Sequence, residues 1–191
     1  MTHTHPGRPD AREYLPYYDT YIRLVPGGDI IEILDRQIDE TAASLSSFTV
    51  ERAEWRPAPG EWSAVEIVGH LADAERVFAY RALAFARNDP APLPGMDPDG
   101  FMAGANFADR SLADVVAEFV AVRHASVALL RSLDAAAWTR GGVADGNPIS
   151  VRALAYIMAG HELHHAKDFP RHHAMGGETA TLGTGDGRLP A

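Results

Sequence analysis

Histidine is the residue type whose spacing in this chain most directly indicates chemistry. His161 and His165 are four residues apart in a stretch with helical periodicity, so both rings project from one face of the helix, one turn apart. They continue an apolar stripe formed by Leu154 and Met158, which directs them toward the core. Burying two imidazoles is costly unless each ring finds a polar partner, and one divalent metal ion can serve both. Because the chain contains nine histidines, a solvent-exposed pair that arose by chance stays open as the alternative.

A third ligand is predicted at His70, on a different helix. Its neighbour Gly69 lies in a helix interior, where glycine costs about 1 kcal/mol and usually answers a packing requirement. The close approach of another helix at a metal site would be such a requirement, whereas a lone core histidine is the other interpretation. The other histidines are less suited as ligands. His3 and His5 lie near the N-terminus, and His172 and His173 lie beyond Pro170. His124 is alone on the third predicted helix, and His164 points about 100° away from His165 around its helix.

The segment His161–His165 also matches H-E-x-x-H, the zinc-protease motif in which Glu162 would be the general base. The extended motif requires a glycine and a histidine at positions occupied here by Asp168 and Arg171. The other form requires a downstream glutamate as third ligand, and only Glu178 is available. No strand pattern precedes the helix to hold a peptide. A metalloprotease is therefore the least favoured interpretation.

Composition limits the class of protein that these residues can serve. The chain has 191 residues, 46% apolar and 23% charged, as expected of one globular domain. It has no cysteine, so a metal site must be built from His, Asp or Glu. The net charge of −9 argues against nucleic-acid binding. No apolar run is long enough to span a membrane and the N-terminus lacks a secretory pattern, so we expect a cytoplasmic protein that does not enter membranes.

Four stretches have apolar residues at helical spacing. They are Asp29–Phe48, Ser63–Arg87, Ser111–Leu133 and Ser150–Asp168. Ser63 and Glu66 form an S-x-x-E capping box at the start of the second. The connection Asn88–Arg110 is rich in proline and glycine and is longer than a turn between antiparallel helices requires, so it predicts a crossover between parallel helices, or a lid over a site.

These features predict an all-α fold, a four-helix bundle in up-down-down-up order with a long crossover between the second and third helices. Residues 29–170 form the predicted bundle. Residues 1–28 contain several tyrosines and are predicted to pack on it as an arm. Residues 171–191 are rich in glycine and polar residues and are predicted to be loose.

The two histidine segments together resemble the DinB-like family of metal-binding four-helix proteins, which includes bacillithiol S-transferases and is related to mycothiol-dependent enzymes. The matching segments are residues 61–75, Tyr80-Arg81, residues 150–152 and residues 160–165. The resemblance extends from about Tyr17 to Phe169 and includes the long connection. It implies a bundle of the same order, often a homodimer, with one metal-binding histidine from the second helix and two from the fourth. These correspond to His70, His161 and His165.

Three neutral imidazoles leave coordination positions open on a divalent ion, which can lower the pKa of water, stabilise a thiolate or polarise a carbonyl. Zn²⁺ is the first choice, with Ni²⁺, Fe²⁺ and Mn²⁺ as alternatives. Carboxylates often orient such ligands, and the candidates are Glu66, Asp73, Glu162 and Asp168. The first functional hypothesis is an enzyme in which the metal activates a low-molecular-weight thiol, or water, toward a small electrophilic substrate. A non-catalytic, metal-binding dimeric module is the second.

Overall fold

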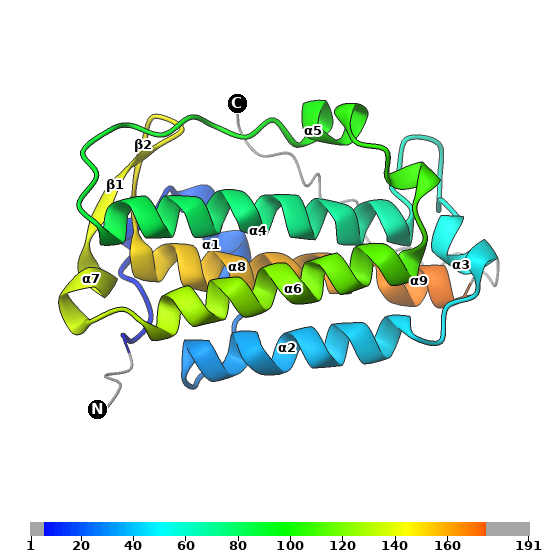
Figure 1. The fold of residues 1–191 in the computed structure, drawn as a ribbon, viewed down its shortest axis with the longest axis horizontal. Coiled ribbons are helices and arrows are strands. Elements are labelled where there is room, and N and C mark those ends of the chain that lie inside the picture. Colours follow the sequence, from blue (N-terminus) through cyan, green and yellow to red (C-terminus); the bar gives the residue numbers. More distant parts are fainter. Residues whose placement is uncertain (1–5, 175–191) are drawn as a thin grey trace.

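The computed structural model describes residues 6–174, and four long helices dominate it (Figure 1). They are α2 (Ile30–Leu45), α4 (Ala64–Ala86), α6 (Leu112–Arg131) and α8 (Val151–Ala166). In Figure 1, α2 and α8 run in one direction while α4 and α6 run in the other. The prediction of an all-α bundle in up-down-down-up order is thereby confirmed, and the helix ends differ from the predicted ones by a few residues.

The starts of these helices follow from local sequence chemistry. The Ser63 hydroxyl accepts a hydrogen bond from the Glu66 N–H at 3.3 Å, and the Glu66 carboxylate accepts one from the Ser63 N–H at 2.8 Å. This is the predicted capping box, which satisfies two backbone donors that the helix start leaves free. The side chains of Asp29, Ser111 and Ser150 cap α2, α6 and α8 in a similar way.

The crossover between α4 and α6 returns along the outside of α4, which allows these two helices to run parallel (Figure 1). Although rich in proline and glycine, it contains the short helix α5 (Pro98–Gly104) and the 3₁₀ helix η3 (Phe107–Asp109). Phe107 is only 7% exposed. A Cβ atom on Gly69 would lie 2.5 Å from the Phe107 ring. Gly69 therefore makes room for an aromatic ring of the crossover, and the prediction that it permits close helix approach at a metal site is wrong.

A β-hairpin lies between α6 and α8, in a segment for which the sequence analysis predicted no strands. The short helix α7 (Ala135–Thr139) leads into β1 (Gly141–Ala144), which pairs antiparallel with β2 (Asn147–Ser150). The turn consists of Asp145 and Gly146, with φ of 53° and 70°, as a tight hairpin turn with two left-handed residues requires. Strand β2 directly precedes α8, so the expectation that no strand precedes this helix is wrong. The hairpin lies at the start of α8, whereas the histidines lie toward its end.

The N-terminal segment packs on the bundle through η1 (Ala11–Glu13), η2 (Pro16–Tyr18) and α1 (Asp19–Ile22). Its contact with α8 is close, because a Cβ on Gly160 would lie 2.2 Å from the backbone oxygen of Tyr21. Only a glycine at position 160 allows α1 to approach α8 in this way. Gly160 immediately precedes His161, so the segment covers α8 beside the predicted metal ligand.

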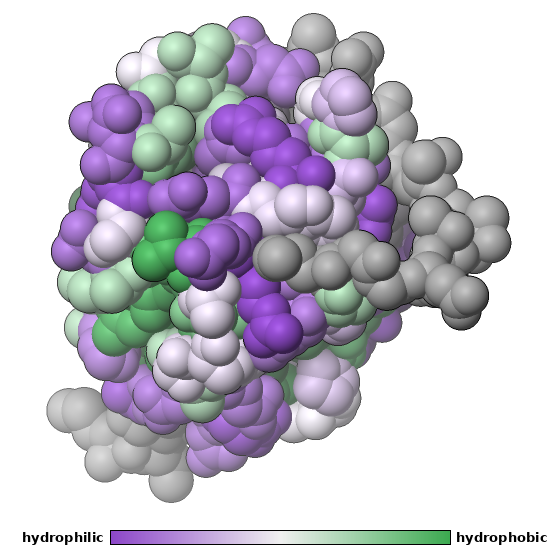
Figure 2. All heavy atoms as spheres, turned by 90° about the vertical axis from the view of Figure 1, so that its right-hand side faces the viewer, coloured by the Kyte–Doolittle hydropathy of each residue, from purple (hydrophilic) through white to green (hydrophobic). Residues whose placement is uncertain are grey.

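The opposite end of the bundle carries α3 (Val50–Glu54) and α9 (Phe169–Ala174). The surface there is mostly hydrophilic, with one compact hydrophobic area (Figure 2). The predicted loose tail begins at Arg171, but residues 171–174 belong to α9 and His172 is fully buried, so that prediction is wrong for these four residues. Residues 175–191, with Glu178, lie outside the described residues, as do His3 and His5.

The interior of the bundle is built from aliphatic and aromatic side chains, among them Leu34, Phe85, Leu154 and Ile157, all at most 1% exposed. Within residues 6–174, no helix combines the length and apolar character needed to cross a membrane. Two groups of polar side chains interrupt this core, and both include residues of α4 and α8.

Candidate metal centre

The three predicted histidines meet in the core. His70 from α4 and His161 and His165 from α8 are 5%, 4% and 8% exposed. The Nε2 atom of His161 lies 3.1 Å from Nε2 of His70 and 3.2 Å from Nε2 of His165. All three residues can offer a ligand atom within 4.8 Å of the others. The fold thus joins residues 91 positions apart in the chain.

Hydrogen bonding alone does not satisfy this arrangement. Each nitrogen of a neutral imidazole carries either one hydrogen or one lone pair, so Nε2 of His161 makes one good hydrogen bond at most. Two other Nε2 atoms nevertheless lie at hydrogen-bond distance from it. Two nitrogens bound at about 2.0–2.1 Å to one ion, with angles between square and tetrahedral, would be about 2.8–3.4 Å apart. The two separations from His161, 3.1 and 3.2 Å, fall in this range, and all three ligand atoms lie within 4.8 Å of one another, so the cluster is compatible with one divalent ion.

Burial keeps the cluster in the form that binds metal. It lowers the pKa of His70 from 6.5 to about 4. Burial also lowers the pKa of His161 and His165 well below the ordinary value, and the neighbouring histidines add to this effect. The rings are therefore neutral near pH 7, and neutral imidazole is the state that donates a lone pair to a metal.

Aromatic side chains pack against the three imidazole rings. The Trp62 ring lies 4.9 Å from the His70 ring, between centroids, and 6.4 Å from the His165 ring. The rings of Tyr21 and Phe78 lie edge-on to His161, at 5.3 and 5.9 Å. These contacts restrict ring rotation and shield the cluster from water. Sequence reasoning did not identify this wall, because Tyr21 reaches the cluster only through the docking of α1 on α8.

Two of the four carboxylates predicted to orient the ligands serve other roles. Glu66 completes the capping box with Ser63 and accepts a hydrogen bond from Arg56 at 2.6 Å. Asp73 forms an ion pair with Arg76 at 3.2 Å. Neither has a hydrogen bond to a ring of the cluster in the described part of the chain.

Asp168 lies one turn beyond the cluster, and its charge acts on a different histidine. Partial burial raises the pKa of its carboxyl, while His164 and Arg171 oppose that rise. His164, predicted to point away from His165, is partly buried and lies edge-on to Tyr21, at 5.2 Å between ring centroids. Asp168 and His164 thus lie beside the three-histidine cluster without joining it.

Glu162 belongs to a second polar group in the core. Its carboxylate is 1% exposed and accepts hydrogen bonds from the Thr41 hydroxyl at 2.6 Å and from Arg123 at 2.7 Å. Arg123 is fully buried and donates to both oxygens of Glu75, at 2.7–2.9 Å, and to the backbone oxygen of Leu34 at 3.1 Å. One side chain from each of the four long helices takes part. We call Thr41, Glu75, Arg123 and Glu162 the buried ionic cluster.

The buried ionic cluster decides between two interpretations of the H-E-x-x-H match. His161 and His165 do converge, as the motif requires. The Glu162 carboxylate, however, is held by α2 and α6 through Thr41 and Arg123. A glutamate bound in this way is not free to act as the general base of a protease.

The remaining histidines do not extend the metal centre. His124 is exposed on α6. His173 lies against Phe48, with 4.5 Å between ring centroids. His172 is fully buried beside Trp55, and neither of its ring nitrogens has a hydrogen-bond partner within the described residues.

The fold and the site together define a class of protein: four-helix bundles in up-down-down-up order, with three histidines from the second and fourth long helices meeting in the core. The model of the DinB superfamily matches residues 33–168, and the chain belongs to this superfamily.

A solved structure with a similar fold is YfiT from Bacillus subtilis, described as a probable metal-dependent hydrolase with an unusual four-helix bundle topology. The TM-score is 0.63 at 17% sequence identity, and the match covers 87% of this chain and 92% of YfiT. A search of curated proteins finds no match.

Proposed function

We propose that this protein is a metal-dependent enzyme in which His70, His161 and His165 hold a divalent ion that activates water, or a low-molecular-weight thiol, toward a small electrophilic substrate. The observation that carries this proposal is the convergence of three buried imidazoles, with Nε2 of His161 at ligand-like separations from Nε2 of both His70 and His165. An all-nitrogen set suits Zn²⁺ first, and Ni²⁺, Fe²⁺ or Mn²⁺ next.

His70, His161 and His165 supply three neutral nitrogen ligands that are held in place and shielded from water. A divalent ion held there would contribute Lewis acidity, which lowers the pKa of a coordinated water or thiol. Burial keeps the three rings unprotonated, so protons do not compete for the lone pairs near pH 7. Trp62, Tyr21 and Phe78 fix the rings and exclude bulk water from one side of the cluster.

Two nucleophiles are compatible with this proposal, a water molecule and a small-molecule thiol. The chain has no cysteine, so a thiol nucleophile would have to arrive as a small molecule. The description of YfiT as a probable metal-dependent hydrolase favours water. Both nucleophiles place the same demand on the three histidines, and both belong to this proposal. The protease hypothesis is not retained, because Glu162 is engaged in the buried ionic cluster.

Elemental analysis of metal content tests the proposal. The protein would be purified without a histidine tag, beside His70→Ala, His161→Ala and the matched control His124→Ala, an exposed histidine on α6. We expect about one metal per chain in the parent and control proteins, and its loss in the two cluster variants.

Equal metal in all four proteins would refute the assignment of the ligands. Metal that binds as expected, without hydrolysis of small esters or amides and without thiol transfer to small electrophiles, would favour the non-catalytic, metal-binding module instead.

A further inference from the structure

The N-terminal segment packs on α8 along one stripe of that helix. It contacts residues at intervals of four, which lie on one helix face: Arg152, Tyr156, Gly160 and His164. Arg152 donates a hydrogen bond to the Glu13 carboxylate at 2.7 Å, and the Arg8 guanidinium lies 5.3 Å from the centre of the Tyr156 ring. The segment therefore follows α8 from its first turn to the turn that carries the metal-binding histidines.

Tyr21 is the residue through which this segment reaches the metal centre. Its side chain is 2% exposed, and its ring lies edge-on to both His161 and His164, at 5.3 and 5.2 Å between centroids. Its backbone oxygen lies against Gly160, where a Cβ atom would be only 2.2 Å away. The same residue thus brings α1 close to α8 and packs against a predicted metal ligand.

The place of the Tyr21 ring depends on the N-terminal segment as a whole. The Tyr21 hydroxyl lies 3.0 Å from the Tyr17 hydroxyl, within hydrogen-bond distance. Arg8 donates hydrogen bonds to the backbone oxygens of Ile22 and Val25, both at 2.6 Å. A helix of four residues such as α1 is not stable by itself, so these contacts and the docking on α8 keep the ring beside His161.

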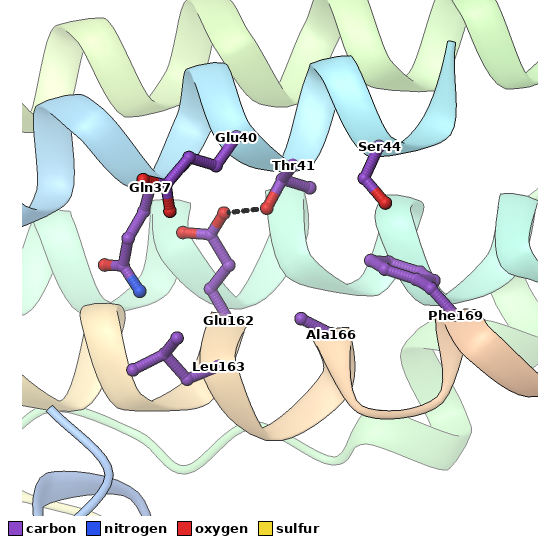
Figure 3. A pocket seen from close by; sticks show the side chains of 8 residues that line it. All are labelled: Gln37, Glu40, Thr41, Ser44, Glu162, Leu163, Ala166 and Phe169. Atoms are coloured by element: carbon purple, nitrogen blue, oxygen red, sulfur yellow. Dashed lines mark hydrogen bonds between the residues drawn. The ribbon is translucent and has the colours of Figure 1, made fainter. Parts of the chain in front are cut away.

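The opposite side of α8 is held by other contacts. Glu162 extends toward α2 and accepts a hydrogen bond from Thr41 at 2.6 Å (Figure 3). Successive residues differ by about 100° around a helix, so this bond fixes α8 without restraining the His161 ring. Apart from the two other ligands, the aromatic rings packed on His161 within residues 6–174 are those of Phe78 and Tyr21. Phe78 belongs to the long helix α4, so Tyr21 is the restraint that can be lost while the bundle stays folded.

We propose that Tyr21 is a positioning residue for His161, and that docking of the N-terminal segment and metal binding at the three histidines stabilise each other. This inference rests on the proposed function, because it requires the three histidines to be the ligands. The docked Tyr21 ring limits the orientations of the imidazole and keeps water from it, so the ligand is arranged before the ion binds. An ion that binds the docked form more tightly favours docking by the same factor.

Zn²⁺ affinity, measured by competition with a chromophoric chelator, tests the role of Tyr21. Tyr21→Ala should weaken Zn²⁺ binding about tenfold, as the loss of a group that orients a metal ligand does. Tyr21→Phe keeps the ring and should retain the parental affinity. The control Leu133→Ala opens a cavity in the core just before α7 and should also retain it. Parental affinity in Tyr21→Ala, or an equal loss in Tyr21→Phe, would overturn the proposal.

Trypsin cleavage after Arg23 measures docking without a change at Tyr21. Arg23 is exposed directly after α1, and the N–H of Leu24 donates a hydrogen bond to the Tyr21 backbone oxygen at 2.9 Å. Cleavage therefore requires local opening of α1. Saturating Zn²⁺ should slow it about tenfold in the parent, the factor by which docking strengthens Zn²⁺ binding. His70→Ala lacks one ligand, so Zn²⁺ should not protect it, and equal rates with and without Zn²⁺ in the parent would refute the coupling.

A second variant keeps the test decisive if Tyr21→Ala does not fold. Gly160→Ala displaces α1 without removing a side chain, and should both weaken Zn²⁺ binding and speed cleavage after Arg23. Faster cleavage with parental Zn²⁺ affinity would refute the coupling and leave the three ligands in place. A parent protein that binds no divalent ion would instead refute the proposed function, and the coupling with it.

Discussion

Replacing Arg123 by methionine tests the energetic role of the buried ionic cluster. The guanidinium is fully buried and makes hydrogen bonds to Glu75, Glu162 and the Leu34 carbonyl. Methionine has a similar length and no charge, so the change leaves two carboxylates in the core without a cation. Removing one partner of a buried ion pair typically costs about 3–5 kcal/mol, because the remaining charge stays desolvated. Two stranded carboxylates place the expected loss at the upper end of this range.

That loss is large beside the total stability of a domain, about 5–15 kcal/mol. Urea unfolding followed by circular dichroism at equal pH measures it. The matched control is Arg131→Met, which removes an exposed cation on the same helix, paired with Asp35 at 2.6 Å. Exposed pairs contribute about 0–1 kcal/mol, so the control should lose far less.

A triple variant, Glu75→Gln, Arg123→Met and Glu162→Gln, should recover much of the loss, since it removes the stranded charges together. An Arg123→Met protein no less stable than Arg131→Met would refute the reasoning. It would mean that the core charges are not desolvated as the geometry implies.

Further predictions concern the three-histidine cluster, the packing of the N-terminal segment on α8, and the oligomeric state. Without metal, the free energy of unfolding should fall as the pH drops from about 6.5 to 4, because the histidines take up protons in the unfolded chain and stay neutral in the folded one. For His70, whose folded pKa is about 4, the expected loss at pH 5 is about 2 kcal/mol. Urea unfolding in the presence of a chelator measures it. A stability that is flat or rises on acidification would contradict the buried neutral state. Gly160→Ala should displace α1, since the new Cβ meets the Tyr21 backbone oxygen, and should cost about 1–3 kcal/mol, whereas Gly104→Ala, where the Cβ meets open space, should cost little. Faster proteolysis of the N-terminal segment in Gly160→Ala alone would report that displacement, and equal rates in the two variants would argue against it. The family resemblance predicts a homodimer, so light scattering after size exclusion should give twice the chain mass of 20.6 kDa. A mass equal to one chain would contradict this prediction.

Much of the fold could be predicted from sequence, because the local signals for helix starts and the length of the long connection are both consistent with the bundle that forms. The Ser63–Glu66 capping box marks a helix start whatever the rest of the chain does. The length of the Asn88–Arg110 connection favoured a crossover between parallel helices, and α4 and α6 run parallel (Figure 1). The hairpin was missed although Asp145-Gly146 is a typical hairpin turn, because its flanking strands are only four residues each and contain glycine and proline. The contact between Gly69 and Phe107 depends on how the crossover folds back, which periodicity does not describe.

The candidate site was predictable to the extent that helical spacing controls it. His161 and His165 share a face by the geometry of the helix, and the family resemblance indicated His70 as their partner. The buried ionic cluster carried a weaker signal: Arg123 follows Phe119 by four residues on an apolar stripe, and Glu75 lies on the stripe of α4. A charge on a core stripe indicates a buried partner. Sequence does not say which one, since the pairing depends on how the four helices rotate against one another.

The distance along the chain between His70 and His161 has a consequence for folding. A chain without cysteine has no disulfide to join its distant parts. A metal ion shared by these histidines would close a loop of 91 residues and act as a reversible cross-link. Closing a loop of that size restricts the unfolded ensemble by on the order of 4–5 kcal/mol in the chain-entropy treatment of disulfides. Unlike a disulfide, this cross-link would strengthen with the concentration of free metal, so the melting temperature of the bundle would report metal supply.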